Sequence, residues 1–234
     1  AQVTEDGSPR GERLFALWNP PLVDAEAGVR ASGTGETARL LASLVRSDHR
    51  VIAFSRSRKG AELVAAQAKR RLPDQLQASV RPYRGGFLAK ERRAIEADLF
   101  AGRLRGVAAT TALELGVDVG GLDACILNGF PGTIASMWQQ AGRAGRAQQR
   151  SLAVLVAGED ALDQWFMAHP TEVFARSPEP AVVNPSNPFV LDDHVACAAY
   201  ELPLTDADDE WWGDELDDAV RRLVLDDRLV LRNG

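Results

Sequence analysis

The stretch Gln139-Gln140-Ala141-Gly142-Arg143-Ala144-Gly145-Arg146 places two arginines three residues apart, each directly after a glycine. At helical spacing, Arg143 and Arg146 would lie on one face. A glycine has no side chain, so Gly142 and Gly145 allow a ligand or another backbone to come close. Two guanidinium groups on one surface suit the terminal phosphate of a nucleotide. The stretch therefore predicts a phosphate contact, with a glycine-punctuated surface turn as the alternative.

Three segments upstream have the same phosphate-binding character, and each follows a predicted strand. They offer hydroxyl groups, guanidinium groups and free N–H groups where a strand passes into a helix, which is where anions bind readily. The segments are Phe54-Ser55-Arg56-Ser57-Arg58-Lys59, Arg84-Gly85-Gly86 with Arg92 and Arg93 in the helix that follows, and the run from Thr110 to Val119 with Glu114 and Asp118.

Apolar runs alternate with amphipathic stretches through the first three quarters of the chain. This alternation predicts an α/β fold with a mostly parallel sheet between helices, whose ligands bind beyond the carboxyl ends of the strands. Strands are predicted at Leu14–Trp18, Val51–Ser55, Ala78–Tyr83, Val107–Thr110, Ala124–Asn128 and Leu152–Ala157. Helices are predicted from Gly33–Glu36 to about Arg46 with Thr34 as its cap, at Ser57–Leu72, at Leu88–Phe100 with Leu88, Ile95, Leu99 and Phe100 on one side, and at Thr133–Gln140.

The pattern changes after Pro178, where four prolines within eleven residues predict a linker. Beyond it we expect a helix over Asn187–Tyr200, a second over Glu215–Leu225 and a short strand at Leu229–Leu231. Two helices followed by a strand would open a small winged-helix-like α+β module. We therefore predict one domain over residues 1–180, and a linker with a partial module over residues 181–234.

The 234 residues are 45% hydrophobic and carry a net charge of −6, which conceals a strong segregation. Residues 46–105 hold 15 Lys or Arg against 6 Asp or Glu, whereas residues 201–234 hold 4 against 11. The basic segment favours a polyanionic partner, although a solvated helix face is an equal alternative. No apolar run approaches the length of about 20 residues that a membrane helix needs. Cys125 and Cys197 lack zinc-ligand spacing, so we predict no metal site, and we expect a reducing cytoplasm.

Taken together, the four segments resemble the second motor domain of superfamily-2 helicases, over roughly residues 10–170. Phe54–Lys59 is similar to motif IV, Thr110–Asp118 to motif V and Gln139–Arg146 to motif VI. The resemblance implies a RecA-like domain that, with a first RecA-like domain of the same polypeptide, clamps ATP and a nucleic-acid strand. It implies that Arg143 and Arg146 reach the γ-phosphate as catalytic arginines and that Asp118 meets the ribose. The other ATP contacts would be Gly116 and Gln139.

The same resemblance implies contacts with the phosphates of a DNA strand by Ser57, Arg58, Gly85 and Thr110. Phosphate contacts position a strand without reading its sequence, so we expect binding that weakens with salt. For Ser57 and Thr110 simple helix capping is an equal alternative, and for Glu114 so is a solvated helix position. Ala89 stands where the family often has glutamine. The remaining expected DNA contacts are Arg56, Arg92, Thr111 and Glu114.

Further segments are similar to a bacterial branch, the mitomycin-repair helicases, which are related to the fungal RecQ-type-4-like enzymes. They include Trp18-Asn19-Pro20-Pro21, Ser55–Leu63, Ala112–Asp118, Asn187-Pro188 and His194–Leu204. This branch implies a 3′-to-5′ DNA helicase of DNA repair, with a winged helix after the motor. It also implies a nucleoid-associated protein of the bacterial cytoplasm that acts on single strands and duplex junctions.

Two groups of residues that ATP hydrolysis requires are missing from the sequence. There is no G-x-x-x-x-G-K-[S/T] loop, and no D-E-x-D or D-E-x-H follows an apolar strand. We therefore expect ATP and Mg²⁺ to be bound mainly by the first motor domain, and this chain alone to be inactive as an ATPase. A non-catalytic RecA-like module that binds DNA or protein is the main alternative. A Rossmann-type enzyme is disfavoured because no G-x-G-x-x-G follows a strand.

Overall fold

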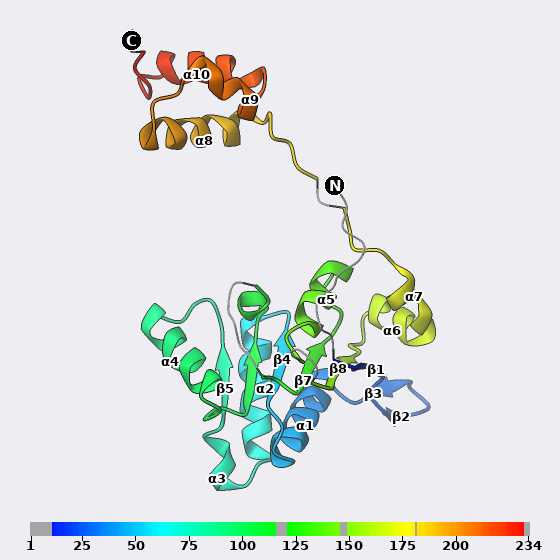
Figure 1. Cartoon of the computed structure of the whole chain (residues 1–234). Coiled ribbons are helices and arrows are strands. Elements are labelled where there is room, and N and C mark those ends of the chain that lie inside the picture. Colours follow the sequence, from blue (N-terminus) through cyan, green and yellow to red (C-terminus); the bar gives the residue numbers. More distant parts are fainter. Residues whose placement is uncertain (1–10, 116–120, 146–148, 181, 232–234) are drawn as a thin grey trace. The chain divides into compact units, whose positions relative to one another are not determined.

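The computed structural model describes residues 11–115, 121–145, 149–180 and 182–231. The chain divides into two compact units between Glu179 and Pro180. The first unit is built on a six-stranded sheet in the order β1-β8-β7-β4-β6-β5 (Figure 1). Its strands are β1 (Arg13–Trp18), β4 (Val51–Ser55), β5 (Val80–Tyr83), β6 (Gly106–Ala109), β7 (Ala124–Asn128) and β8 (Ser151–Val156).

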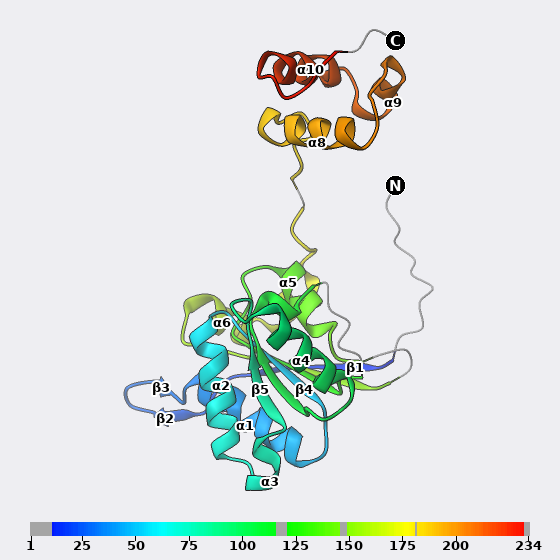
Figure 2. The same ribbon diagram turned by 90° about the vertical axis from the view of Figure 1, so that its left-hand side faces the viewer.

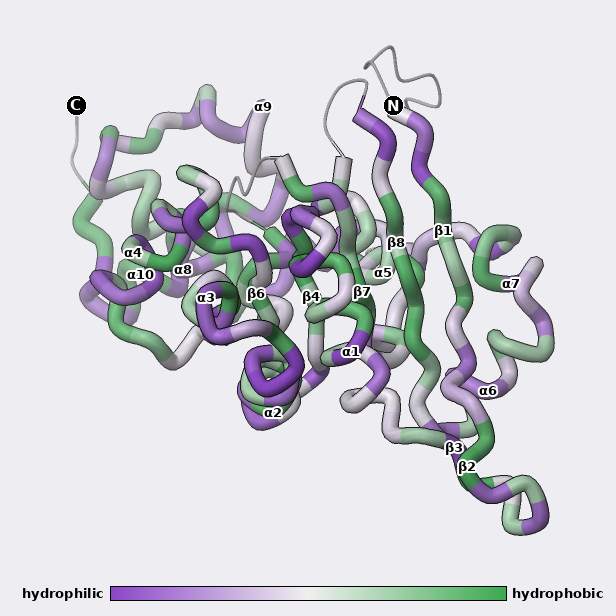
Figure 3. The backbone as a smooth tube through the Cα atoms, turned by 90° about the horizontal axis from the view of Figure 1, so that it is seen from below, coloured by the Kyte–Doolittle hydropathy of each residue, from purple (hydrophilic) through white to green (hydrophobic). Residues whose placement is uncertain are grey.

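Every pair of neighbouring strands in this sheet is parallel, which confirms the predicted α/β class and all six predicted strands. The strands are mostly apolar on both faces, as expected of parallel strands covered by helices. Figure 3 shows β7 and β8 largely in the hydrophobic colour. A short antiparallel hairpin, β2 (Leu22–Asp24) with β3 (Val29–Arg30), lies between β1 and the first helix and was not predicted.

Helices cover both faces of the sheet, and successive side chains of a strand point into separate cores. In β4, Val51 and Ala53 pack into one core and Ile52 and Phe54 into the other. Figure 2 shows α2 and α4 on opposite sides of the strands. The helices of the first unit are α1 (Gly33–Arg46), α2 (Arg58–Arg70), α3 (Asp74–Gln77), α4 (Ala89–Phe100), α5 (Ile134–Ala141), α6 (Ala161–Ala168) and α7 (Pro170–Ala175).

Two predicted details of these helices are wrong. The side chain of Ser32, not that of Thr34, caps α1 by accepting a hydrogen bond from the N–H of Gly35 at 3.4 Å. In α4, only Ile95 and Leu99 are buried, whereas Leu88 and Phe100 are 73% and 68% exposed. Leu88 precedes the helix as its N-cap and Phe100 is its last residue, so both lie at the ends of the buried face.

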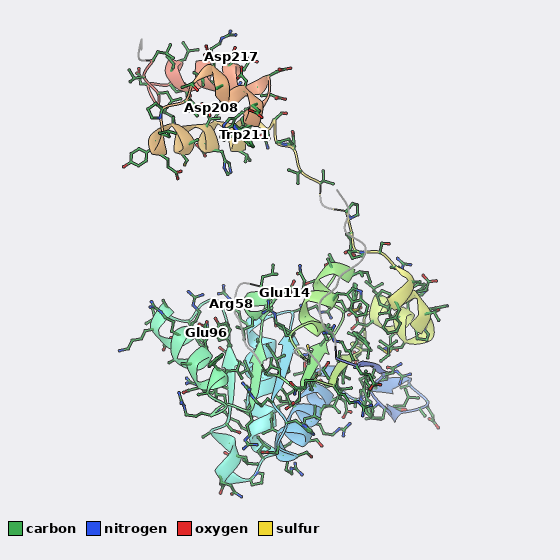
Figure 4. All side chains as sticks on the ribbon, viewed as in Figure 1. Arg58, Glu96, Glu114, Asp208, Trp211 and Asp217 are labelled. Carbon is green, nitrogen blue, oxygen red and sulfur yellow. The ribbon has the colours of Figure 1, made fainter. Side chains whose placement is uncertain are left out.

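The described residues of the second unit form three helices, α8 (Pro188–Glu201), α9 (Asp209–Trp212) and α10 (Glu215–Leu225), and a short 3₁₀ turn η2 (Asp206–Asp208). Its small core joins α8 to α10 through Leu191, Val195, Leu216, Ala219 and Leu223. Trp212 packs against this core, whereas its neighbour Trp211 is 80% exposed (Figure 4).

The predicted strand at Leu229–Leu231 is wrong. The N–H groups of Arg228 and Leu229 both donate to the carbonyl of Leu223, at 2.8 and 3.1 Å, so this segment turns back onto the end of α10. No strand is described in residues 182–231 that could pair with it, and a strand needs a partner to be stable. Among the described residues, no helix is both long and apolar enough to cross a membrane.

Candidate functional site

The loops after β4, β5 and β6 begin side by side at the carboxyl edge of the sheet. Phe54 of β4 is in register with Ala109 of β6, and Ala109 is in register with Tyr83 of β5. The three loops enclose a shallow pocket of about 340 Å³. It is lined by Arg56, Arg58, Gly85, Thr110, Thr111 and Ala112. Five of these six residues are DNA contacts expected from the sequence, and they come from segments up to 55 positions apart.

Two hydroxyl groups beside this pocket cap the structures that follow them. The Ser57 oxygen accepts a hydrogen bond from the N–H of Gly60 at 3.0 Å and so caps α2. The Thr110 oxygen accepts from the N–H of Ala112 at 3.5 Å, at the start of the 3₁₀ turn η1 (Thr111–Leu113). The capping role considered for both residues is therefore present, while Thr110 also lines the pocket and Ser57 stands between the lining residues Arg56 and Arg58.

Gly86 leaves space for the guanidinium groups of Arg84 and Arg58. A Cβ on Gly86 would lie 2.7 Å from one terminal nitrogen of Arg84 and 3.6 Å from one of Arg58. Arg84 also lies over the ring of Phe87, 4.7 Å from its centroid, and pairs with Glu62 at 2.8 Å. Arg84 was not among the expected DNA contacts. It stands in the Arg84-Gly85-Gly86 segment that was predicted to have phosphate-binding character, but it does not itself line the pocket.

Arg92 belongs to a different group of side chains and does not line the pocket. It lies on α4 near the buried Tyr83, whose hydroxyl donates to Glu96 at 2.5 Å. Burial, and then the hydrogen bond to Glu96, raise the pKa of Tyr83 to about 12, while the Arg92 guanidinium acts in the opposite direction. A DNA contact by Arg92 remains a prediction.

Glu114 connects the segment after β6 to α5. Its side chain is only 8% exposed, and its carboxylate accepts hydrogen bonds from Ser136 at 2.6 Å and from the buried Gln140 at 2.9 Å. The solvated position considered for Glu114 is therefore wrong, because this carboxylate is buried. Its placement favours a role in joining the segment after β6 to α5 over direct contact with DNA. Neither Ser136 nor Gln140 was predicted as a site residue, although Gln140 stands beside Gln139 in the arginine stretch.

Arg143 also contacts the segment after β6, at the backbone of Glu114. Its Nε donates to the backbone carbonyl of Glu114 at 2.9 Å, and its Nη2 donates to the same oxygen. Figure 4 shows Glu114 and Arg58 at one end of the sheet, so Arg143, which contacts Glu114, lies near the edge that carries the pocket. Arg143 is thus anchored to a strand-end loop.

Arg143 does not lie on a helix, and Arg146, the other arginine of the expected helix face, lies outside the described residues. Helix α5 ends at Ala141 with Gly142 as its cap, and Gly145 has a φ of +84° that a helix does not allow. A side chain at Gly145 would lie 2.6 Å from the Ser151 oxygen, while its N–H donates to the carbonyl of Leu122 at 2.9 Å. The chain therefore leaves the helix and runs beside the start of β7.

The other expected ATP contacts are placed only in part. Gln139 is exposed on α5. Gly116, Asp118 and Arg146 lie outside the described residues. The ATP contacts therefore remain predictions.

An acidic pair beside Arg56 is a further feature that was not predicted from the sequence. Asp160 pairs with Arg56 at 2.9 Å, and Asp163 is buried, accepting from the N–H groups of Phe130 at 3.0 Å and Gly158 at 2.6 Å. Burial raises the pKa of Asp163 above its usual value, more than these N–H groups lower it. Within the described residues, no group of three or more His, Cys, Asp or Glu side chains is placed to hold a metal ion.

Comparison with known protein families assigns each unit. Residues 36–148 match the model of the helicase conserved C-terminal domain. Residues 183–232 match the winged helix domain of the ATP-dependent helicase HRQ1. Both matches agree with the fold, since the first covers the sheet from α1 to β7 and the second covers α8 to α10.

Similar proteins extend over nearly the whole chain. An uncharacterized ATP-dependent helicase of Bacillus subtilis, YprA, is 42% identical over 99% of this chain and 31% of its own length. The ATP-dependent helicase HRQ1 of Saccharomyces cerevisiae is 38% identical over 86% of this chain and 20% of its own. The crystal structure of the DUF1998 helicase MrfA bound to DNA and AMPPNP superposes with a TM-score of 0.83, at 42% identity, over 99% of this chain and 32% of that one. The chain thus spans about a third or less of these relatives.

Proposed function

Because this chain belongs to the superfamily-2 helicases, in the branch of YprA and MrfA with an HRQ1-type winged helix, we propose that it works as the second motor half of an ATP-dependent 3′-to-5′ DNA helicase that acts in repair. The observation that carries this proposal is the pocket after β4, β5 and β6. Arg56, Arg58, Gly85, Thr110 and Thr111 meet there. Guanidinium, hydroxyl and glycine N–H groups are the donors that bind a phosphate backbone.

The pocket is the DNA side of the proposed motor. Its chemistry suits successive phosphates of one strand, with Ser57 beside it at the start of α2. The positive ends of α2 and of the turn after Thr110 favour negative charge there. Such contacts carry no base information, so the proposed binding is independent of sequence. Single strands and duplex junctions are the proposed substrates, in the bacterial cytoplasm.

The arginine stretch is the ATP side of the motor. We assign Arg146 to the γ-phosphate as an arginine finger, with Arg143 beside it, and Gly116, Asp118 and Gln139 to the rest of the nucleotide. Arg143 supports this role by tying its loop to the carbonyl of Glu114. A first motor domain would supply the phosphate-binding lysine, the Mg²⁺ ligands and the residue that orients water. This chain alone would then not turn over ATP.

The test separates a motor from a non-catalytic DNA-binding module. In the complete protein, Arg146→Ala should lower DNA-stimulated ATP turnover by about 10³-fold or more, since an arginine finger is worth that much. DNA affinity should change by less than about threefold, because the pocket is untouched. Unchanged turnover, or an equal loss of turnover and affinity, would favour the module.

A further inference from the structure

The guanidinium of Arg56 lies in a slot formed by two glycines and the carboxylates of Asp160, which pairs with it, and Asp163, which lies beside the same glycines. Its Nη2 donates to the Oδ2 of Asp160 at 2.9 Å. A Cβ on Gly129 would lie 3.0 Å from this nitrogen, and one on Gly158 would lie 3.6 Å from it. Gly129 also has a φ of +84°. The slot is therefore open because neither glycine carries a side chain.

Asp160 is held in place by contacts that do not involve Arg56. Its Oδ1 accepts from the N–H of Asp163 at 3.0 Å and so caps α6. Burial alone would raise the pKa of Asp160, but the N–H of Asp163 and the Arg56 guanidinium together hold this pKa below its usual value. A fixed, ionised carboxylate therefore stands beside one cation of the DNA pocket at neutral pH.

Arg56 is accessible from the pocket while it is paired. Its side chain is 54% exposed and lines the pocket together with Arg58 and Thr110. A guanidinium has five N–H donors. An exposed ion pair is worth about 0–1 kcal/mol, whereas arginine binds a phosphate through two parallel hydrogen bonds. A strand phosphate can thus compete with Asp160 for this group.

We propose that Asp160 is a positioning residue that serves as the internal counter-anion of Arg56 and exchanges with a phosphate of the bound strand. This inference rests on the proposed function, since it needs the pocket to bind DNA. A motor must release each phosphate as it steps along the strand. When a phosphate leaves, Asp160 takes back Arg56, so the released state does not expose an unpaired charge. The exchange lowers affinity for the strand and favours release.

The test removes the charge of Asp160 and keeps its cap. Asparagine caps helices as well as aspartate does, so Asp160→Asn in the complete protein should leave α6 intact. Affinity for a single-stranded oligonucleotide should rise by about threefold to tenfold at roughly 50 mM salt. The slope of log K against log salt should steepen by up to about 0.7, the value for one more phosphate contact on a single strand. A damaged fold cannot raise affinity. Asp98→Asn, in a similar exposed pair with Arg103 at 2.7 Å, should change neither.

Two further variants keep the inference open to refutation. Arg56→Gln should abolish the effect of Asp160→Asn, and alone it should weaken binding much less than Arg58→Ala does. Unchanged or weaker binding by Asp160→Asn and by Asp160→Ser, which also caps well, would overturn the inference, as would equal losses from Arg56→Gln and Arg58→Ala. If Arg58→Ala leaves DNA binding intact, the proposed function itself fails, and the two failures are thereby distinguished.

Discussion

Arginines occur in two regions at the carboxyl edge of the sheet, and their surroundings differ. Arg56 and Arg58 are exposed at the pocket, and Arg56 pairs with the partly exposed carboxylate of Asp160. Arg143 is partly buried and donates twice to one backbone carbonyl, in a loop shaped by Gly142 and Gly145. An exposed guanidinium can exchange one anion for another, whereas Arg143 is fixed in one geometry. The first arrangement suits a strand that moves, and the second suits a charge that develops at one point.

The largest expected effect is a loss of ATP turnover when Arg143 is replaced. Arg143→Ala removes both hydrogen bonds to the Glu114 carbonyl, and DNA-stimulated ATP turnover in the complete protein should fall by about 10²–10³-fold. The dissociation constant for single-stranded DNA should stay within about threefold, because the pocket is intact. Arg103→Ala, an exposed arginine before β6, should leave both unchanged. A loss of affinity as large as the loss of turnover would show that the two regions are not separate.

The next effect is a loss of stability when Gly145, in the loop that carries Arg143, is replaced. Gly145→Ala forces a side chain onto a residue with φ of +84° and against the Ser151 oxygen, so the free energy of unfolding should fall by about 1–3 kcal/mol in urea titration. Gly28→Ala is the matched control, since Gly28 has a φ of +69° but open space around it. It should cost only about 1 kcal/mol. Equal losses would mean that Ser151 does not constrain the loop.

Glu114→Gln tests whether Glu114 joins the segment after β6 to α5 or contacts DNA directly. The neutral side chain keeps the shape but weakens the charge-assisted bonds from Ser136 and Gln140, so stability should fall by about 1–2 kcal/mol. DNA affinity and its salt dependence should not change. A steeper salt dependence without loss of stability would instead place this carboxylate next to the strand.

The smallest expected effect concerns Ser57, which lies beside the exposed arginines of the pocket. Ser57→Ala should cost about 1 kcal/mol of stability through the lost cap of α2, whereas Ser57→Asp should keep the cap. The added negative charge beside the pocket should weaken DNA binding in Ser57→Asp more than in Ser57→Ala. The opposite order, measured by fluorescence anisotropy, would separate Ser57 from the strand.

The sequence was most informative where residues are set by local rules. Runs such as Val51–Ser55 predict buried strands, and loops after parallel strands must share one edge, so the lining of the pocket was predicted from segments far apart. The pairing of Glu114 with Gln140, and of Arg56 with Asp160, was not predicted. The first contact joins residues that are 26 positions apart and the second joins residues that are 104 positions apart. No local sequence pattern indicates which side chains of two distant segments will meet.

The helix predicted at Arg143 is absent for a related reason, since α5 ends at Ala141. Gly145 adopts a left-handed conformation because the chain must pass Ser151 of β8 and bond to Leu122, and both neighbours are distant in sequence. The predicted strand at Leu229–Leu231 is wrong because an apolar run forms a stable strand only where a partner strand exists. Glycine spacing and apolar runs indicate which secondary structure a segment can form, and tertiary contacts determine whether it forms.

The central claim is that the loops after β4, β5 and β6 bind a nucleic-acid backbone, and the salt dependence of binding by Arg58→Ala tests it most directly. In the complete protein, this variant should bind single-stranded oligonucleotides of different sequence more weakly by a similar factor. Its slope of log K against log salt should be shallower by about 0.7, the value for one lost phosphate contact. An unchanged slope, or a loss confined to one oligonucleotide sequence, would contradict the account.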